Sequence, residues 1–452
     1  MNTVSLSRAA SRKRVTNVSV WKKTLIWGIF LTCVVLMLHV NTWAEKTVDF
    51  YVGMFTSITF AYFLLKMVVS FWYKPDIREP YPGIKVSVVI PSFNENPDSV
   101  LKTIECLIDQ DYPVAEIIFV DDGSDDPSAY EAVKRLAEEV NGARLEAAAA
   151  LEMGGARYHW AKDLPEIVVH RFDKNQGKRA AQLWGFKRST GDFLMIVDSD
   201  GYIYPDAIRE LLKPFHDPEV TAVCGHINAR NRDYNFVTRL QDLLYKSAFR
   251  VGRAAMSVTN AVLVCSGALS MFRRDVVMNN LHHFRDQKFL GRKIVAGDDR
   301  RLTTIALYEG KVKYQSTARC ITDVPTTISQ FFKQQVRWGK SVYVETPFTI
   351  PVALKKPFLM LWFIGESFLW AIYGTSVIVT FTTAPTTTLP LLVIYSLGYL
   401  TLSALMRNVY YVLKHPLLYL LSPVFGLVHS FLLYPIRIYA LLTLRGTGWG
   451  TR

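Results

Sequence analysis

The chain has 452 residues, of which 50% are hydrophobic, and its 52 Lys and Arg against 39 Asp and Glu give a formal net charge of +13. This length allows a sizeable globular domain together with several membrane spans, because single domains usually hold about 100 to 200 residues. The basic residues are dispersed among acids or stand beside apolar stretches, so we expect them to orient membrane segments rather than to bind nucleic acid. The five cysteines show neither a disulfide framework nor zinc-site spacing.

Two apolar stretches near the N-terminus, residues 24–44 and 50–72, are predicted to span a membrane. Each is close to the roughly 20 residues that a helix needs to cross the hydrocarbon core. Basic residues from Arg8 to Lys23 precede the first stretch and predict a cytoplasmic N-terminus. A cleavable signal peptide is the competing interpretation, but the apolar run is too long for one and no small-residue cleavage site follows it.

The C-terminal part contains two further predicted spans, residues 358–381 and 389–413, joined by an uncharged loop. Basic residues bracket this hairpin on the side that we expect to be cytoplasmic, namely Lys355, Lys356, Arg407 and Lys414. A last apolar block, residues 417–444, is interrupted by Pro423, Pro435 and Arg437. If this block crosses the membrane once, the tail at residues 445–452 is outside. If the block is re-entrant or crosses twice, the tail is inside.

The polar middle of the chain is predicted to be a cytosolic α/β domain. Three apolar, mostly β-branched or aromatic runs are typical of buried parallel strands: residues 86–90, 117–120 and 193–197. Residues 97–110 and 128–140 have helical periodicity, so strand and helix alternate as in an open sheet. Such sheets bind ligands at the carboxyl ends of their strands, and polar motifs follow all three runs, at 92–95, 121–124 and 198–200. The Ala-rich residues 142–163 are expected to be a helical surface insertion without chemistry, before a strand-like run at 167–170.

Asp198 and Asp200 follow the third run and are separated by one residue. A hard divalent cation needs oxygen ligands and usually shares them with phosphate oxygens, so this pair favours Mg²⁺ or Mn²⁺ holding a nucleoside diphosphate. An isolated pair of this kind is often a solvated turn. The second acidic strand end, Asp121-Asp122, favours the functional interpretation.

Asp121 and Asp122 are candidates to accept hydrogen bonds from a uracil or ribose, with a capped turn as the alternative. Residues 175–179 place Gly177 before Lys178 and Arg179 at a predicted helix start, which suits a diphosphate. A solvated basic turn is the alternative there.

A further acidic pair, Asp298-Asp299, stands between a glycine and two arginines. One of these carboxylates is a candidate to take the proton from an attacking sugar hydroxyl. A salt-bridged helix start, with Asp298 as the cap, explains the motif equally well.

Gln334, Arg337 and Trp338 form a QxxRW motif directly before the C-terminal apolar segments. Arginine can stabilise a departing diphosphate, and tryptophan offers a flat face to a sugar ring. An amphipathic helix at the membrane surface, over residues 327–343, also favours both residue types. The two interpretations are compatible.

In this order, the motifs resemble the processive family 2 glycosyltransferases with a GT-A catalytic fold, which include cellulose, chitin and hyaluronan synthases. The resemblance covers nearly the whole chain from residue 85 onward. Finer matches are similar to hyaluronan synthases in particular: residues 197–205 (VDSDGYIYP), 225–232 (GHINARNR), 265–267 (CSG), 297–300 (GDDR), 314–320 (YQSTARC) and 449–452 (WGTR). Two features depart from the pattern: Ala268 stands where the family usually has proline, and the Ala-rich insertion is longer than expected.

The resemblance implies a role for each motif in an inverting transfer from UDP-sugars. Asp121 and Asp122 hold the uridine, Asp198 and Asp200 hold the metal and diphosphate, and Lys178 binds the donor. Asp299 is the catalytic base, beside Asp298 in the substrate site. Gln334 and Arg337 contact the diphosphate, Trp338 contacts the acceptor sugar, and the acceptor pocket is lined by Cys265, Ser266 and Gly267.

The resemblance also divides the chain. We expect a cytoplasmic tail (1–23), two transmembrane helices (24–73), a cytosolic GT-A domain with a Rossmann-like mixed sheet (74–325), interfacial helices with QxxRW (326–356), channel helices (357–444) and a cytoplasmic tail (445–452). The family keeps residues 449–452 on the cytoplasmic side, which favours an even number of crossings over the simplest hydropathy count of five.

The sequence therefore predicts a multi-pass plasma-membrane hyaluronan synthase whose partners are UDP-glucuronic acid, UDP-N-acetylglucosamine, the growing polysaccharide and membrane lipid, with no nucleic acid and no obligate protein partner. The first alternative is a chitin-type synthase that uses UDP-N-acetylglucosamine only. A second alternative is a non-processive, lipid-linked glycosyltransferase, but that function does not explain the QxxRW motif. A transporter that only senses nucleotide sugars tolerates the substitution Asp299→Asn, whereas an enzyme does not.

Overall fold

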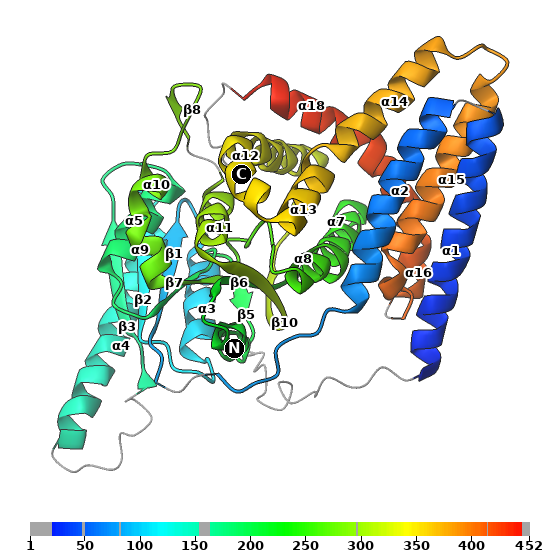
Figure 1. The fold of residues 1–452 in the computed structure, drawn as a ribbon. Coiled ribbons are helices and arrows are strands. Elements are labelled where there is room, and N and C mark those ends of the chain that lie inside the picture. Colours follow the sequence, from blue (N-terminus) through cyan, green and yellow to red (C-terminus); the bar gives the residue numbers. More distant parts are fainter. Residues whose placement is uncertain are drawn as a thin grey trace.

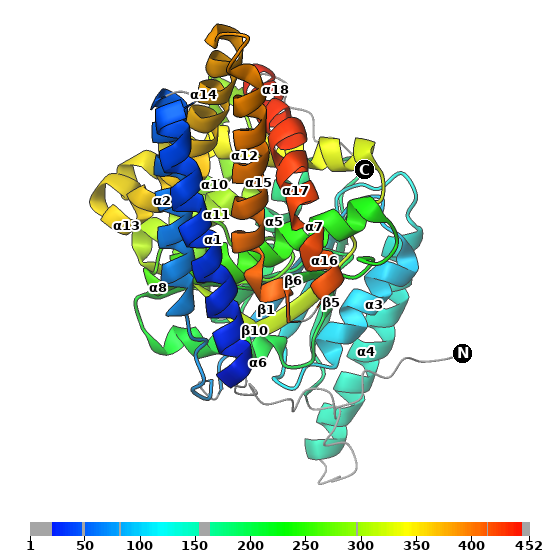
Figure 2. The same cartoon turned by 90° about the vertical axis from the view of Figure 1, so that its right-hand side faces the viewer.

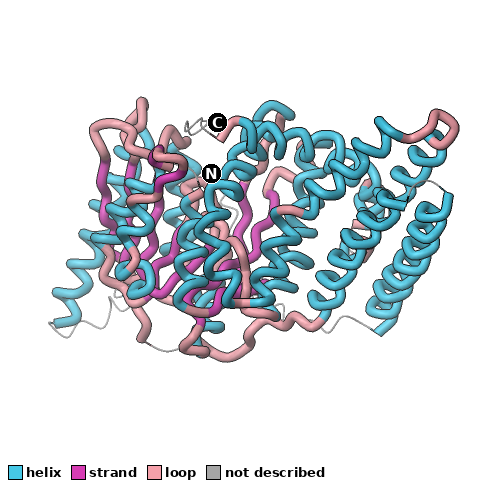
Figure 3. Tube along the Cα trace, turned by 45° about the horizontal axis from the view of Figure 1, so that its top comes forward, coloured by secondary structure: helices cyan, strands magenta, loops and turns pink. Residues whose placement is uncertain are grey.

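The computed structural model describes residues 20–47, 50–80, 83–152, 163–294, 297–413 and 415–444. An α/β domain lies on one side and long apolar helices lie on the other, with α12 (Ile328–Lys355) between them (Figure 1). In the tube view of Figure 3 the strands gather at one side, away from the apolar helices. The expected insertion of a catalytic domain between two groups of apolar helices is confirmed.

The domain is built on one eight-stranded sheet with the strand order β3-β2-β1-β4-β7-β6-β10-β5. The strands are β1 (Val86–Ser92), β2 (Glu116–Asp121), β3 (Glu166–Arg171), β4 (Phe193–Ile196), β5 (Tyr202–Ile203), β6 (Val220–Ala229), β7 (Ser270–Arg273) and β10 (Lys311–Thr322). β3, β2, β1 and β4 are parallel, whereas β7 is antiparallel to both β4 and β6. The sheet is therefore mixed, with a Rossmann-like parallel half. A small hairpin, β8 (Lys288–Phe289) and β9 (Arg292–Lys293), stands apart from it.

Every residue of β1 and β2 is buried, which explains their continuous apolar runs, because helices cover both faces of a parallel sheet. The helices of the domain are α3 (Pro97–Ile108), α4 (Ser128–Glu152), α5 (Lys178–Arg188), α6 (Ala207–Leu212), α9 (Arg274–Asn279), α10 (Leu281–Arg285) and α11 (Asp298–Glu309), with a 3-10 turn η3 (Lys213–His216). α4 extends beyond the expected 128–140, since alanine is the strongest helix former and the Ala-rich stretch continues the helix. Residues 153–162 of the expected insertion lie outside the described residues.

A second group of helices follows β6 and packs beneath the apolar helices. It consists of α7 (Phe236–Ser247), the π-helical η4 (Ala248–Arg253) and α8 (Ala254–Val258). α8 and η4 contact α2, and α7 contacts α17. This group therefore connects the sheet to both ends of the chain's apolar part.

Five stretches of the described chain are long and apolar enough to cross a membrane: Thr24–Lys46, Val52–Phe71, Pro357–Thr383, Leu389–Arg407 and Ser422–Leu442. They comprise α1 (Val20–Thr47), α2 (Phe50–Phe71), α13 (Pro357–Ser367), α14 (Leu369–Thr383), α15 (Leu389–Arg407), α17 (Ser422–Val428), the π-helical η6 (His429–Leu433) and α18 (Tyr434–Leu442). The short η5 (Val409–Tyr411) and α16 (Pro416–Leu420) lie between α15 and α17. α1, α2 and α15 run side by side (Figure 2). The four predicted spans and the last apolar block all coincide with these stretches, and residues 445–452, which bear on the parity of crossings, lie outside the described residues.

The third of these stretches is not one straight helix, although residues 358–381 read as a single span in the sequence. The helix breaks at Phe368, so α14 has 15 residues and a length of about 22 Å at about 1.5 Å per residue. α13 packs instead against the core of the catalytic domain, where Leu359 and Trp362 are buried and Trp362 Nε1 donates a hydrogen bond to Thr259 Oγ1 at 2.8 Å. This stretch therefore consists of two shorter helices, and the first of them packs one face against the catalytic domain.

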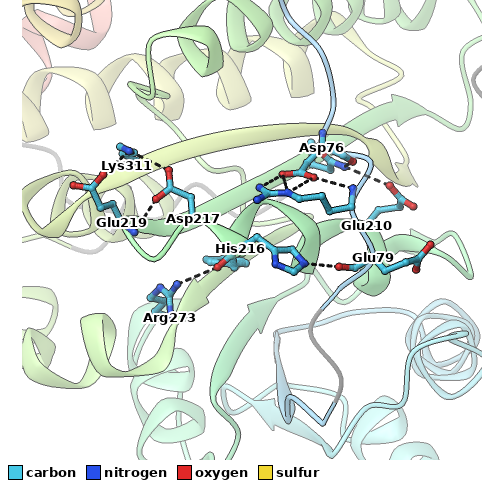
Figure 4. Close-up of polar contacts among 11 residues, drawn as sticks. Asp76, Glu79, Glu210, His216, Asp217, Glu219, Arg273 and Lys311 are labelled. Atoms are coloured by element: carbon cyan, nitrogen blue, oxygen red, sulfur yellow. Dashed lines mark hydrogen bonds and ion pairs between the residues drawn. The ribbon is translucent and has the colours of Figure 1, made fainter.

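The segment between α2 and β1 is fixed to the sheet domain by polar contacts (Figure 4). Asp76 exchanges two hydrogen bonds with Gln315, from its backbone N–H at 3.0 Å and to its carbonyl at 2.8 Å. His216 donates a hydrogen bond to the carbonyl of Glu79. Nearby, Lys311 at the start of β10 pairs with Asp217 at 3.0 Å. The first two apolar helices are therefore held in a defined place relative to the sheet.

Candidate active site

The carboxyl ends of β1, β2 and β4 meet at one edge of the sheet, and the predicted metal motif lies there. Lys178 Nζ donates a hydrogen bond to Asp198 Oδ1 at 2.5 Å and lies 3.9 Å from Asp298 Oδ2. A Cβ placed on Gly267 would lie 3.4 Å from Lys178 Nζ and 3.5 Å from Asp198 Oδ1. Asp200 is buried two residues further on. Four separate segments thus bring together residues that the sequence predicted one by one.

Lys178 is held charged by its surroundings. Burial lowers the pKa of its ammonium, but the carboxylates of Asp198 and Asp298 raise the pKa by more than burial lowers it. The pKa of Lys178 therefore lies above its usual value. Gly177 precedes it with a φ of 94°, a conformation that favours glycine, and is the N-cap of α5, which begins at Lys178. The site therefore holds a permanent cation at a helix N-terminus, where anions bind well.

Asp121 and Asp122 at the end of β2 are buried and engaged within the protein. Asp121 accepts hydrogen bonds from Arg171 Nε at 3.0 Å and from the Ser124 N–H at 3.2 Å. Asp122 accepts one from the N–H of Gln176 and one from the N–H of Gly177, both at 2.8 Å. Burial raises the pKa of Asp122, and these N–H groups counteract the rise. The two carboxylates thus fix the loops that surround the end of β2 and lead into α5.

Asp298 and Asp299 form the first turn of α11, after Gly297 in a left-handed conformation with a φ of 83°. The helix therefore begins at Asp298, and the alternative in which Asp298 caps it is wrong. Asp298 accepts a hydrogen bond from Gln182 Nε2 at 2.9 Å. Burial raises the pKa of Asp299 and the Asp298 carboxylate raises it further, while Arg300 and Lys178 oppose the rise. A carboxylate with a raised pKa is suited to accept a proton.

The predicted acceptor segment, residues 265–267, divides into two parts. Cys265 is fully buried, and its backbone N–H donates to Thr303 Oγ1 of α11 at 2.8 Å. Burial raises the pKa of its thiol, so this side chain belongs to the core of the domain. Gly267 lies against the Lys178–Asp198 pair, and Ser266, partly exposed, stands between the two. Gly267 is therefore the residue that brings this motif to the Lys178–Asp198 pair.

The QxxRW motif lies in the N-terminal half of α12, which starts with a capping box between Thr327 and Gln330. The helix runs to Lys355, further than the expected 343, with two prolines inside it. Trp338 is 37% exposed, and its ring centre lies 6.4 Å from that of Tyr245 on α7. Burial raises the pKa of the Tyr245 phenol, and the Asp198 carboxylate raises it further. Trp338 is therefore next to a tyrosine that is within electrostatic range of the metal motif.

Gln334 and Arg337 lie on the same helix. The buried Oε1 of Gln334 is one of the atoms without a hydrogen-bond partner in the described part of the chain. Buried polar atoms in proteins are nearly always hydrogen-bonded, so this oxygen is suited to a ligand. Arg337 is partly exposed.

The oxygen donors at the site fit a divalent cation that shares its ligands with a substrate. Asp198 and Asp200 supply two carboxylates, and the described residues contain no cluster of three or more His, Cys, Asp and Glu side chains. Mg²⁺ commonly binds through one or two carboxylates together with substrate phosphates. Gly267, which has no side chain, lets its backbone lie close to Lys178 and Asp198.

Three residues of the site were not predicted from the sequence. Arg171, at the end of β3, binds Asp121, and a basic residue after a strand-like run was a usable signal. Gln182 and Tyr245 carry no such signal, because each reaches the site only through the packing of its helix.

Comparisons with known proteins agree with this geometry. A model of the family "Glycosyltransferase like family 2" matches residues 82–341. A hyaluronan synthase from Streptococcus pyogenes serotype M1 is 41% identical over 435 residues, 96% of this chain and 98% of the relative. An N-acetylglucosaminyltransferase from Rhizobium meliloti (strain 1021) is 30% identical over 392 residues, 84% of this chain and 83% of the relative. A solved mannosyltransferase from Pyrobaculum calidifontis, in complex with GDP-Man and Mn²⁺, has a similar fold, with a TM-score of 0.58, 19% identity, and coverage of 88% of this chain and 98% of that chain.

The fold and site define a family 2 glycosyltransferase with a GT-A-type catalytic domain. Within that class, the chain belongs to the hyaluronan synthases. The resemblance stated from the motifs is confirmed.

Proposed function

We propose that this protein polymerises glucuronic acid and N-acetylglucosamine from their UDP derivatives and passes the polymer through its own apolar helices. One observation carries the proposal: the metal motif, the candidate base and the QxxRW helix form one site directly against these helices. Gly339, next to Trp338, lies so close to α18 that a Cβ on it would be 3.0 Å from Ala440 Cβ. Tyr343 OH donates to the carbonyl of Arg437 at 3.2 Å.

The donor binds at the strand ends. Asp121 and Asp122 shape the uridine site by holding the loops around it, and Lys178 neutralises the diphosphate. Mg²⁺ or Mn²⁺, held by Asp198 and Asp200, adds positive charge that stabilises the departing diphosphate. Arg337 supplies a second cation for this group, and Gln334 offers its free Oε1 to a hydroxyl of the substrate.

Transfer is an inverting displacement. The acceptor hydroxyl oxygen forms a bond to the anomeric carbon of the donor while the bond from that carbon to UDP breaks. Asp299 takes the hydroxyl proton, and UDP leaves with the bonding electron pair. Trp338 holds the acceptor sugar in line for this attack, and Ser266 and Gly267 line the acceptor pocket.

The polar domain faces the cytoplasm, where UDP-sugars occur, and the polymer leaves outward across the plasma membrane. This orientation follows from the basic residues beside the apolar helices. Membrane lipid is the surrounding partner.

A polymer assay tests the proposal. Purified protein in lipid is given each UDP-sugar singly and both together, with Mg²⁺ or Mn²⁺. A hyaluronidase-sensitive polymer that forms only with both donors is the expected result. The similarity to an N-acetylglucosaminyltransferase makes a chitin-type reaction the second candidate. Polymer from UDP-N-acetylglucosamine alone, without use of UDP-glucuronic acid, refutes the proposal and supports that candidate.

A further inference from the structure

One face of α12 connects the acceptor platform to the helix that carries the candidate base. Trp338, Ser341 and Glu345 are spaced three and four residues apart, so they lie on the same face of the helix. Ser341 Oγ donates a hydrogen bond to the carbonyl of Trp338 at 2.7 Å and accepts one from Arg300 Nε at 3.1 Å. A single hydroxyl thus joins the backbone at the tryptophan to the residue that follows Asp299.

The contact continues along both helices in register. Arg301 Nη1 of α11 lies 3.3 Å from Glu345 Oε1 of α12. One turn further on, the Thr304 and Thr349 hydroxyls are 3.5 Å apart, and Tyr308 OH donates to the carbonyl of Phe348 at 3.0 Å. α11 is therefore tied to α12 along its length, and its first turn is held through Arg300 and Arg301.

The ion pair in this contact is buried on both sides. The side chain of Arg301 is 7% exposed and that of Glu345 is 5% exposed. Gln287 Nε2 donates to Glu345 Oε2 at 2.7 Å, and the Arg301 guanidinium lies 4.1 Å from the centre of the Phe348 ring. Replacing such a pair by apolar residues is often neutral for stability, so the pair is better explained by the geometry it imposes.

We propose that Glu345 is a positioning residue, which holds the first turn of α11 through Arg301 and thereby sets the distance between the base Asp299 and the acceptor on Trp338. This inference rests on the proposed function, because it takes Asp299 as the base and Trp338 as the acceptor platform. Most donor-side groups come from other elements: Asp198 follows β4, Lys178 begins α5 and Asp122 follows β2. The contribution of α11 to that side is Asp298, 3.9 Å from Lys178 Nζ. Loss of Glu345 therefore disturbs the acceptor more than the donor.

Such a loss has a specific chemical signature. When the acceptor hydroxyl is misplaced, water attacks the anomeric carbon instead, the bond to UDP breaks, and free sugar and UDP are released. The number of UDP molecules released per sugar incorporated then rises. A general loss of folded enzyme lowers both quantities in proportion and leaves their ratio unchanged.

The test is the variant Glu345→Gln, which keeps the shape and the contact with Gln287 but removes the charge. We expect incorporation to fall about 10- to 100-fold, as for a small displacement of reacting groups, with the UDP-to-sugar ratio increased and the donor KM nearly unchanged. The double variant Glu345→Gln/Arg301→Gln removes both charges of the ion pair together, and we expect it to melt closer to the wild type than Glu345→Gln does while its ratio stays raised. A normal ratio in both variants overturns the proposal.

Ser341→Ala provides a milder second test, which decides the matter if Glu345→Gln does not fold. It removes the hydroxyl between Arg300 and Trp338, and we expect a smaller increase in the same ratio; an unchanged ratio overturns the proposal. Lys311→Gln is the control, because it breaks an ion pair with Asp217 at the start of β10 and leaves the ratio normal (Figure 4). The wild type in the same assay tests the proposed function separately, since the ratio is measured with whichever donors the wild type incorporates.

Discussion

The two sides of the active site are built in different ways. On the donor side, Asp121-Asp122 and Asp198-Ser199-Asp200 stand at the carboxyl ends of β2 and β4, which both pair with β1. On the acceptor side, Asp299, Trp338 and Tyr245 come from α11, α12 and α7, and helix packing alone brings them together. The donor side is therefore fixed by backbone hydrogen bonds of a sheet, and the acceptor side by side-chain contacts between helices.

This difference suits a polymerase. The nucleotide is the same in both proposed donors, so a rigid site at the sheet edge serves each of them. The acceptor end changes at every addition and moves onward, so a site made of helices, of which α12 also contacts α18, can follow the polymer. Substitutions on the two sides should accordingly separate donor binding from transfer.

The largest effect is expected from Asp299→Asn, because an amide cannot accept the acceptor proton. We expect turnover to fall about 100- to 10,000-fold while donor affinity stays nearly unchanged. UDP release and equilibrium binding of the donor measure the two quantities. Asp286→Asn is the control, since that carboxylate forms an ion pair with Arg285 at the exposed surface. If donor affinity falls as strongly as turnover, Asp299 belongs to the donor side and the comparison is wrong.

The same difference explains what the sequence could predict. A strand end is a local feature, so the positions of Asp121, Asp198 and Asp200 followed from apolar runs and the polar residues after them. The start of α11 at Asp298 and the burial of the Cys265 thiol depend on packing, and the sequence left the first open and placed the second in a pocket. The break at Phe368 also escaped prediction, because the residues before and after it are similarly apolar and composition does not show that α13 packs one face against the catalytic domain.

Lys178→Met tests the donor side. It removes the cation from between Asp198 and Asp298 and with it a charged hydrogen bond, which is worth about 1.5 to 3 kcal/mol. We therefore expect the donor KM to rise about 10- to 100-fold, with a smaller change in kcat. Lys187→Met, an exposed position on the same helix, is the matched control. A lower kcat at an unchanged KM assigns Lys178 to the transfer step instead.

Trp338→Ala tests the acceptor side. An aromatic contact contributes about 0.5 to 1.5 kcal/mol, so we expect incorporation to fall about 2- to 10-fold, and the polymer to become shorter, while UDP release from the donor alone persists. Trp338→Phe keeps a ring and should retain most of the activity. Phe332→Ala, at an exposed position of the same helix, controls for the loss of an aromatic side chain. Equal loss of UDP release and incorporation contradicts a role in holding the acceptor.

The smallest expected effect is a change in the pH dependence of the rate. It involves both sides of the active site, because Asp298 lies 3.9 Å from Lys178 on the donor side and directly precedes the base Asp299. Asp299 acts only when ionised, and its pKa is raised by burial and then by the Asp298 carboxylate. The rate should therefore fall as the pH drops through a value above the ordinary range of a carboxyl group. Asp298→Asn removes one negative charge while its amide oxygen still accepts the hydrogen bond from Gln182, so the pKa of Asp299 decreases and the acid limb of the kcat profile moves to lower pH. The kcat measured against pH at saturating donor shows this shift, and Asp286→Asn is the control that should not shift. If the acid limb of the Asp298→Asn profile stays in place, a group other than Asp299 controls the loss of activity at low pH.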